Sequence, residues 1–525
     1  MTEEYIYPTE QSFELHEQIT GLLLKQDLKG AVEIIDNLIS GKTVLTITIA
    51  DFAKIEFAAR YIDIADDMTL YNDLIHDSNK LIKKAFGIFN QINKDIEIVF
   101  ESFISKNRAR AYMIQFDNGY RLKMIKNNQK INGVPEVETM YEIKGTISNA
   151  IENYWRALQI EIDEEEKYNI RNNLSNAMLR TGRYIEALTL LELNIKSLPE
   201  RWQSNGSFAD VLIKLIKESS IPTTASLFCV IAENYFKVAE AQLNEPEKVR
   251  VRSVINWCKL ELEEFNMVLT KDLIIENRTE EIRDFEKNTD YRKLVLENSL
   301  SINEHAVYCM CLNSAKDTLK IGAPQGSMHL AKAKVFPILD GLVNRILSEF
   351  AYARLLYLNY TAEKKTDYPV DLDFSTLSGN EVLGYQIEQV RASYRIAYSI
   401  LDKIANGILI LFGIDKDRRM SYFEDVFDIY KDKLEEINNI HLTALYSLSL
   451  DLNRGNGSLK HFKDKRNEME HGYLAVHNEN GIIPEITSIS GAELKQFTFE
   501  VLQLARAAIF SFVFLIRTET IYETN

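Results

Sequence analysis

The stretch ASYRIAYSILDKIANGILILFGI, residues 392–414, decides the fold class of this chain. Apolar side chains recur along it at intervals of three and four residues, the period of a helix with one apolar face. The residues on this face are Tyr394, Ala397, Leu401, Ile404, Ile408 and Leu411. The same period returns near the end of the chain at Leu494, Phe497, Val501, Ala505, Ala508, Phe512 and Leu515. Two further helical segments, about Tyr422–Leu452 and Leu459–Ala475, lie between them, so residues 380–525 are predicted to form a four-helix bundle.

The composition extends this helical prediction to the whole chain. Of the 525 residues, 46% are hydrophobic and 26% are charged, which are ordinary values for a globular protein. The chain has only 21 glycines and 9 prolines, about half the usual share. Because both residues interrupt helices and build tight turns, their scarcity predicts an all-α fold and excludes an all-β one.

The net charge and the length of the apolar runs limit the kinds of partner that we expect this protein to bind. The net charge of −16 argues against a protein that coats DNA or an anionic membrane by bulk charge, although it leaves room for a local basic cleft. The longest apolar run, Ala507–Ile516, is much shorter than the ~20 residues that span a membrane, so we expect a buried helix and no membrane partner. Four scattered cysteines and an acidic N-terminus favour the cytoplasm.

Loop signals divide the chain into three regions. The steps Asn118-Gly119 and Asn132-Gly133 bracket a basic polar stretch that we interpret as a connection. Further breaks are expected at Gly322–Ser327 and over the long polar stretch Lys364–Asn380. The predicted regions are an N-terminal helical region (1–133), a helical-repeat region (134–365) and the bundle (380–525).

The second of these regions contains a possible repeat unit. NNLSNAMLRTGRYIEALTLLELNIKSLP, residues 172–199, resembles a tetratricopeptide (TPR) unit, with Gly182, Tyr184 and Ala187 at the turn and the second helix, and Pro199 at the stop. Fainter units begin near Gly145 and Leu28. Stacked helix pairs offer a concave surface for a peptide or protein. Ordinary helical hairpins are the alternative interpretation.

Several kinds of active site are excluded by their missing residues. Gly41-Lys42-Thr43 ends like a phosphate-binding loop but lacks the earlier glycine that such a loop requires. Cys309 and Cys311 lie beside His305 on an expected helix, and the sequence offers no complete ligand set around them. We therefore expect no metal site and no cofactor.

The third helix of the predicted bundle carries the best candidate for chemistry. HFKDKRNEMEHGYL, residues 461–474, contains Arg466, Asn467 and His471. It resembles the motif of the HEPN superfamily (higher eukaryotes and prokaryotes nucleotide-binding), whose ribonucleases carry Arg-x(4–6)-His, often with a polar residue directly after the arginine. Residues 392–414 also resemble the first helix of a TPR-linked branch of that superfamily, and EFAYARLLY, residues 349–357, resembles the segment that precedes it there.

The resemblance implies a HEPN-type endoribonuclease that needs no metal. The RNA 2′-hydroxyl would attack the adjacent phosphorus, His471 would move protons, Arg466 would stabilise the phosphorane, and Asn467 would orient the histidine or contact phosphate. Lys460, Lys463 and Lys465 would bind the RNA backbone. The resemblance further implies a homodimer or higher oligomer with two facing motifs, and an anti-phage or abortive-infection effector whose repeats sense a trigger.

The residues alone leave other interpretations open. Arg466 and Glu470 are four apart and could form an ion pair on a solvated helix face, with His471 an incidental surface residue. Arg454 and His461 satisfy the bare Arg-x(6)-His pattern as well. Arg466 and His471 lie about 140° apart around a helix, so the arginine must reach round to join the histidine. The competing functions are a non-catalytic scaffold that dimerises through its bundle, and a HEPN domain restrained or modified by a partner nucleotidyltransferase.

Overall fold

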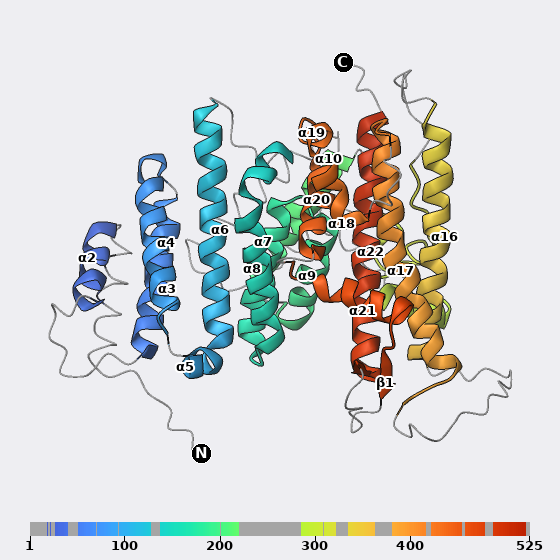
Figure 1. The fold of residues 1–525 in the computed structure, drawn as a ribbon, viewed down its shortest axis with the longest axis horizontal. Coiled ribbons are helices and arrows are strands. Elements are labelled where there is room, and N and C mark those ends of the chain that lie inside the picture. Colours follow the sequence, from blue (N-terminus) through green and yellow to red (C-terminus); the bar gives the residue numbers. More distant parts are fainter. Residues whose placement is uncertain are drawn as a thin grey trace, which may run out of the picture. The chain divides into compact units, whose positions relative to one another are not determined.

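The computed structural model divides the chain into two compact units (Figure 1). Unit 1 comprises Met1–Gly133 and Glu142–Ala177, and unit 2 comprises Val134–Tyr141 and Met178–Asn525. The residues that the structure describes are 18, 22, 27–39, 51–69, 71–92, 94–127, 137–199, 201–219, 285–307, 309–321, 334–362, 381–415, 422–453, 457–477 and 487–520. Over these residues helices dominate and the strands amount to one short pair, which confirms the predicted all-α class. The division between units falls inside the predicted 134–365 region.

Over the described residues, the N-terminal region of unit 1 is built on four longer helices. These are α2 (Leu28–Ile39), α3 (Asp51–Met68), α4 (Ile75–Phe89) and α6 (Glu101–Lys126). Two short elements, η1 (Asn72–Leu74) and α5 (Lys94–Val99), connect them. Helix α3 packs along α4, and α4 along α6, as the blue helices of Figure 1 show.

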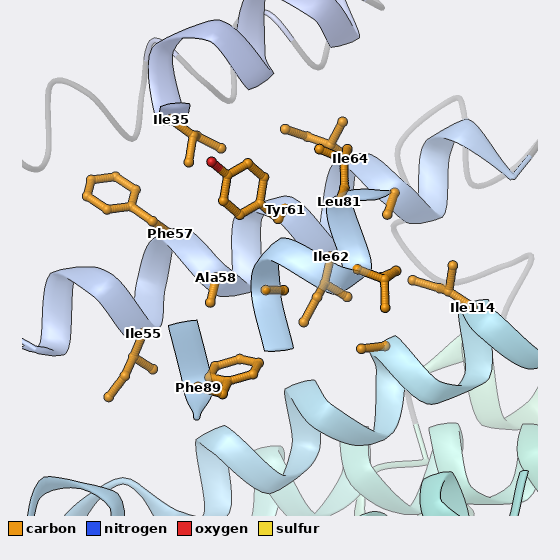
Figure 2. Close-up of a cluster of buried hydrophobic side chains, with 14 of the residues drawn as sticks. Ile35, Ile55, Phe57, Ala58, Tyr61, Ile62, Ile64, Leu81, Phe89 and Ile114 are labelled. Atoms are coloured by element: carbon orange, nitrogen blue, oxygen red, sulfur yellow. The ribbon is translucent and has the colours of Figure 1, made fainter. Parts of the chain in front are cut away.

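Apolar residues at helical spacing explain the core of unit 1. Ile55, Ala58, Ile62 and Ala65 follow one another at intervals of three and four along α3 and are all fully buried. Figure 2 shows Ile55, Ala58 and Ile62 among the side chains of α4 and α6. Tyr61 keeps its polar end satisfied there by donating a hydrogen bond of 2.5 Å to Asp36 Oδ1.

The expected connection at Asn118-Gly119 is wrong, because α6 continues unbroken to Lys126. Asn118 is fully buried, and its side-chain amide donates hydrogen bonds of 3.0 Å to Ser78 Oγ and to Asn79 Oδ1. The asparagine therefore serves as a polar link between α6 and α4. An Asn-Gly step predicts a turn only where no such partner is available to the side chain.

Two long helices follow α6 in the chain and lead into the repeat-like segment, residues 172–199. Helix α7 spans Val137–Ile160 and α8 spans Glu164–Arg180. The faint repeat unit expected at Gly145 is not a helical hairpin, since Gly145 lies inside α7. Helix α8 does end at the predicted turn, where Gly182 adopts a φ of +78° that favours glycine. Helix α9 (Tyr184–Ser197) begins two residues later and packs against α10 (Trp202–Ser219).

The C-terminal part of unit 2 contains the predicted bundle together with α16 (Phe336–Thr361), which was not expected in it. Its long helices are α16, α17 (Tyr385–Leu411) and α22 (Gly491–Thr520), which pack against one another (Figure 1). Gly407 of α17 permits this close approach, because a Cβ there would collide with the Phe512 ring of α22. Helix α16 was expected in the repeat region, but it packs along α17.

The second helical segment of the bundle is broken, contrary to the expected continuous helix over Tyr422–Leu452. It consists of α18 (Phe423–Ile429), α19 (Lys431–Leu434) and α20 (Ile440–Leu452). Asn439 starts α20 as its N-cap, and its side chain accepts hydrogen bonds from the backbone of His441 and Leu442. Helices as short as these contain too few residues for their ends to be recognised from the spacing of apolar residues.

The third segment ends earlier than expected and is followed by a small sheet. Helix α21 spans Lys460–His471, after which β1 (Ala475–His477) pairs in parallel with β2 (Ser488–Ser490). Ala475 was expected at the end of the helix and instead lies in this strand. Val476 and Ile489 are buried in a small core beside α17 and α22, which holds the strand pair in place.

Helix α22 passes the length and composition test for a membrane span. Of its most apolar window, 78% is buried inside the structure, as in the core helix of a bundle. The predicted loops at Gly322–Ser327 and Lys364–Asn380 lie outside the described residues.

The turn at Gly182 lies against helix α20 of the bundle. A Cβ on Gly182 would meet Ile440 of α20 at 2.8 Å, so the glycine allows the close contact. The next residue, Arg183, forms an ion pair with Asp451 of α20, and both side chains are only 1% exposed. Helices α9 and α10 also pack on α22. The second half of the repeat-like segment is therefore part of the same packed unit as the bundle.

Candidate functional site

Helix α21 is held in the bundle by one buried aromatic anchor. Phe462 is buried at its start, and the Phe462 carbonyl oxygen accepts a hydrogen bond of 2.7 Å from Tyr394 Oη of α17. The rings of His461 and Phe462 pack with Phe497 of α22. These contacts fix which face of α21 turns inward and therefore where the motif residues point.

Arg466 lies half-sheltered between two helices rather than on an open face. Its guanidinium carbon is 6.0 Å from the centre of the Tyr398 ring of α17, a cation–π arrangement. Its Nη1 donates a hydrogen bond of 3.1 Å to Asn467 Oδ1, and its Nε is 3.1 Å from Glu470 Oε2. The arginine is thus oriented by three neighbours, two of them on its own helix.

Glu470 joins the arginine to the histidine. Its Oε2 atom lies 3.1 Å from Arg466 Nε and 3.7 Å from His471 Nε2. His471 is the last residue of α21, and its side chain is 73% exposed. The helix therefore ends at the histidine, and one carboxylate oxygen spans the angle of about 140° that separates Arg466 from His471 around an ideal helix.

The other predicted residues, Asn467, Lys460 and Lys465, have different surroundings in the structure. Asn467 was expected to orient His471 or to contact phosphate, and in the structure its side-chain oxygen accepts a hydrogen bond from Arg466. Lys460 is exposed at the start of α21, while Lys465 is half-buried with Nζ 3.5 Å from Glu468. Arg466 and Asn467 lie in the middle of α21, and His471 is its last residue.

The prediction that Lys463 binds RNA is wrong, because this lysine is buried. Its side chain is only 4% exposed and forms an ion pair with Glu424 of α18, whose side chain is 2% exposed. Burial lowers the pKa of Lys463, and Asp402 on α17 acts in the opposite direction. The three lysines at 460, 463 and 465 do not share a face, because Lys463 and Lys465 are two residues apart, about 200° around the helix, and Lys463 points into the bundle. Lys463 is placed as a structural residue.

A half-buried carboxylate, Asp402, completes the polar cluster beside the motif. Asp402 Oδ1 accepts a hydrogen bond of 3.0 Å from the backbone N–H of Phe423, at the start of α18. Burial raises the pKa of Asp402, against the opposing influence of that hydrogen bond and of Arg466 and Lys463. The cluster ties α17, α18 and α21 together directly beneath Arg466.

Sequence reasoning missed two of the residues that shape this site. Glu424 carries no recognisable signal, because a glutamate on a short helix is ordinarily exposed. Tyr398 belongs to the apolar face of α17 and is not distinguished by sequence from its packing neighbours. Glu470 is predicted from its spacing only as a surface partner of Arg466. Arg454, which belongs to the second Arg-x(6)-His pattern, lies outside the described residues.

A second cluster of reactive side chains occurs away from α21. His305, Cys309 and Cys311 offer ligand atoms that all lie within 4.8 Å of one another. The helix expected there is wrong, since His305–Val307 form a single 3-10 turn and the cysteines follow it in a loop. The turn brings together three groups that the sequence presented as an incomplete ligand set.

Comparison with known proteins supports the identity of the bundle. Residues 330–519 match the model of a family described as LA2681-like HEPN. The match begins just before α16 and ends within α22, so it supports a C-terminal HEPN domain that includes α16. No curated protein and no solved structure matches the chain.

Proposed function

We propose that this protein is an endoribonuclease of HEPN type that cleaves RNA without a metal ion. The observation that carries the proposal is the end of α21, where Glu470 connects a sheltered arginine with an exposed histidine. The match of residues 330–519 to a HEPN family supports the same reaction class. Cleavage would proceed by attack of the RNA 2′-hydroxyl on the adjacent phosphorus.

The proposed roles follow from the chemistry of the two side chains. An exposed imidazole can accept or donate a proton near neutral pH, so His471 would take the proton of the 2′-hydroxyl or give one to the leaving oxygen. A guanidinium has five N–H donors, and two of those on Arg466 are directed to Asn467 and Glu470. The others are available for the oxygens of a phosphorane. Asn467 and Glu470 would act as positioning residues.

Binding of RNA and of other copies of the chain belongs to the same proposal. Lys460 and Lys465 lie on the helix that ends in His471 and would contact the RNA backbone. A second copy of the chain would supply a second motif to one shared groove, as the family resemblance implies. Helix α9, which is part of the unit that contains the bundle, offers a route by which a bound protein or peptide trigger would act on it in an anti-phage response.

Variants of the motif test this proposal against a non-catalytic scaffold. Parent protein, His471→Ala and Arg466→Ala would be incubated with total RNA and tRNA, with folding checked by circular dichroism. Removal of one electrostatic group from such a site typically lowers the rate about 10²- to 10³-fold. Cleavage by the parent that both variants lose supports the nuclease. Intact RNA with all three proteins, or equal cleavage by all three, favours the scaffold.

A further inference from the structure

The cluster formed by His305, Cys309 and Cys311 has the donor set of a metal site. One imidazole nitrogen and two thiol sulfurs lie within 4.8 Å of one another. Zinc binds sulfur at ~2.3 Å and imidazole nitrogen at ~2.0–2.1 Å, so ligands around one ion are separated by less than that limit. Neither cysteine is in a disulfide, which leaves both sulfurs available as ligands.

The backbone is already folded around this donor set. The Cys309 N–H donates a hydrogen bond of 3.1 Å to the His305 carbonyl oxygen, so the two side chains stand on one side of a single turn. The Cys311 N–H is 3.4 Å from Cys309 Sγ, and Ser314 Oγ lies 3.3 Å from Cys311 Sγ. Hydrogen bonds to sulfur are the kind of support that outer groups give to metal-bound thiolates.

Both sulfurs of the donor set are sheltered from bulk solvent, since Cys309 is buried and Cys311 is half-buried. A cysteine binds a metal ion as its thiolate.

The loop that carries the cluster is fastened to two helices of the bundle. Arg354 of α16 donates a hydrogen bond of 2.9 Å to the Leu300 carbonyl and one of 2.8 Å to Asp317 Oδ1. Arg506 of α22 donates one of 2.8 Å to the Ser301 carbonyl. The donor set is therefore presented by a constrained loop, which reduces the cost of assembling the ligands around an ion.

We propose that His305, Cys309 and Cys311 bind one zinc ion, which stabilises the fold of this loop. Thiolate ligands select zinc over magnesium or calcium, and the mixed nitrogen and sulfur set suits its tetrahedral geometry. The fourth position is left to water. Both cysteines would bind as thiolates, so binding would release their thiol protons. The ion would be structural, and the reaction proposed for Arg466 and His471 does not use it.

Cobalt substitution tests the site directly. Reduced full-length protein, freed of metal with a chelator, would be titrated with Co²⁺ and followed by absorption. We expect a near-ultraviolet charge-transfer band from thiolate to cobalt and visible bands of tetrahedral cobalt, saturating at one ion per chain. Stoichiometric Zn²⁺ should remove these bands. A parent protein that shows no thiolate band at saturating cobalt overturns the proposal whatever its variants do.

Variants assign the ligands. Cys309→Ser and Cys311→Ser should each lose or strongly weaken the charge-transfer band, and His305→Ala should weaken binding at least about tenfold. His76→Ala, which changes an exposed histidine of unit 1, is the matched control and should bind cobalt like the parent. A band of full intensity in the Cys309→Ser/Cys311→Ser double variant would overturn the assignment. Because the readout involves no RNA, it is independent of whether the protein is a nuclease.

Discussion

Arg466 and His471 are linked through a single oxygen atom, Oε2 of Glu470, which lies 3.1 Å from the arginine Nε and 3.7 Å from the histidine Nε2. Five residues apart, the two side chains would diverge on a helix that continued beyond them. Here α21 ends at His471, and the Glu470 carboxylate lies between the two side chains. The ion pair between Arg466 and Glu470, which on a solvated face would be unremarkable, is here part of the arrangement that orients the arginine.

Replacement of Glu470 tests this linkage. Glu470→Gln keeps the size of the side chain but removes the charge that faces Arg466 Nε and His471 Nε2. We expect kcat for RNA cleavage to fall about tenfold or more with little change in KM, because a positioning residue acts on the aligned complex rather than on binding. Steady-state kinetics on a defined RNA would measure the split.

Glu468→Gln is the matched control for that experiment. Glu468 lies on the same helix but pairs with Lys465, at 3.5 Å, rather than with the arginine. Its replacement should leave kcat within about twofold of the parent, as surface substitutions usually have small effects. Equal losses in the two variants, or none in Glu470→Gln, would refute the positioning role.

Replacement of Lys463 by alanine is expected to lower stability, whereas replacement of Lys460 by alanine is expected to weaken RNA binding. Lys463→Ala leaves Glu424 as an uncompensated buried charge, which typically costs about 3–5 kcal/mol of the free energy of unfolding. Lys460→Ala, at an exposed position, should leave that free energy unchanged and weaken RNA binding. Urea unfolding and a filter-binding titration separate the two effects. A Lys463→Ala protein of parental stability would show that the buried pair is misassigned.

The pair formed by Arg183 and Asp451 is expected to hold α9 and its preceding turn to the bundle. Both side chains are 1% exposed, so Asp451→Ala should lower the free energy of unfolding by about 3–5 kcal/mol. The double variant Arg183→Met/Asp451→Leu should recover part of the loss, because it removes both charges of the buried pair, while Glu186 loses its partner Arg183. Urea denaturation of the single and double variants measures the coupling. Strictly additive losses would contradict a direct pair.

His461 should give the stability of the protein a measurable pH dependence. Burial lowers its pKa, so near pH 6.5 and below the unfolded chain takes up a proton that the folded protein takes up only at lower pH. Its contribution to stability is therefore complete above about pH 6.5 and is lost as the pH falls. His461→Phe retains the packing against Phe462 and Phe497. The parent should lose stability relative to this variant between pH 7 and pH 5, and parallel curves would contradict the burial.

Periodicity was sufficient to predict α17 and α22 of the bundle. The apolar residues of α17 and α22 lie on faces that are buried from end to end, and their spacing records that burial directly. It could not reveal the breaks around α19, since Asn439 acts through a local cap rather than through a period. Nor could it show that Asn118 would find partners inside a helix, because those partners lie about forty residues away in the chain.

The residues of the motif can be recognised in the sequence, whereas the residues that pack around them cannot. Arg466, Asn467 and His471 are adjacent in sequence and carry a recognisable pattern, whereas Glu424 and Asp402 meet Lys463 only after three helices have packed. The basic run at Lys460–Lys465 looked like one surface because its letters are neighbours, yet the helix turns one lysine inward. His305, Cys309 and Cys311 likewise converge through a turn that their spacing alone did not indicate.

Cleavage of RNA at the end of α21, by attack of the 2′-hydroxyl, is tested most directly by end-group analysis. Samples of tRNA and total RNA would be incubated with parent protein, His471→Ala and the control His461→Phe, with no divalent metal added. We expect 2′,3′-cyclic phosphate ends with the parent and with His461→Phe, and none with His471→Ala. Cleavage that requires magnesium, or cyclic ends that persist in His471→Ala, would contradict the proposed reaction.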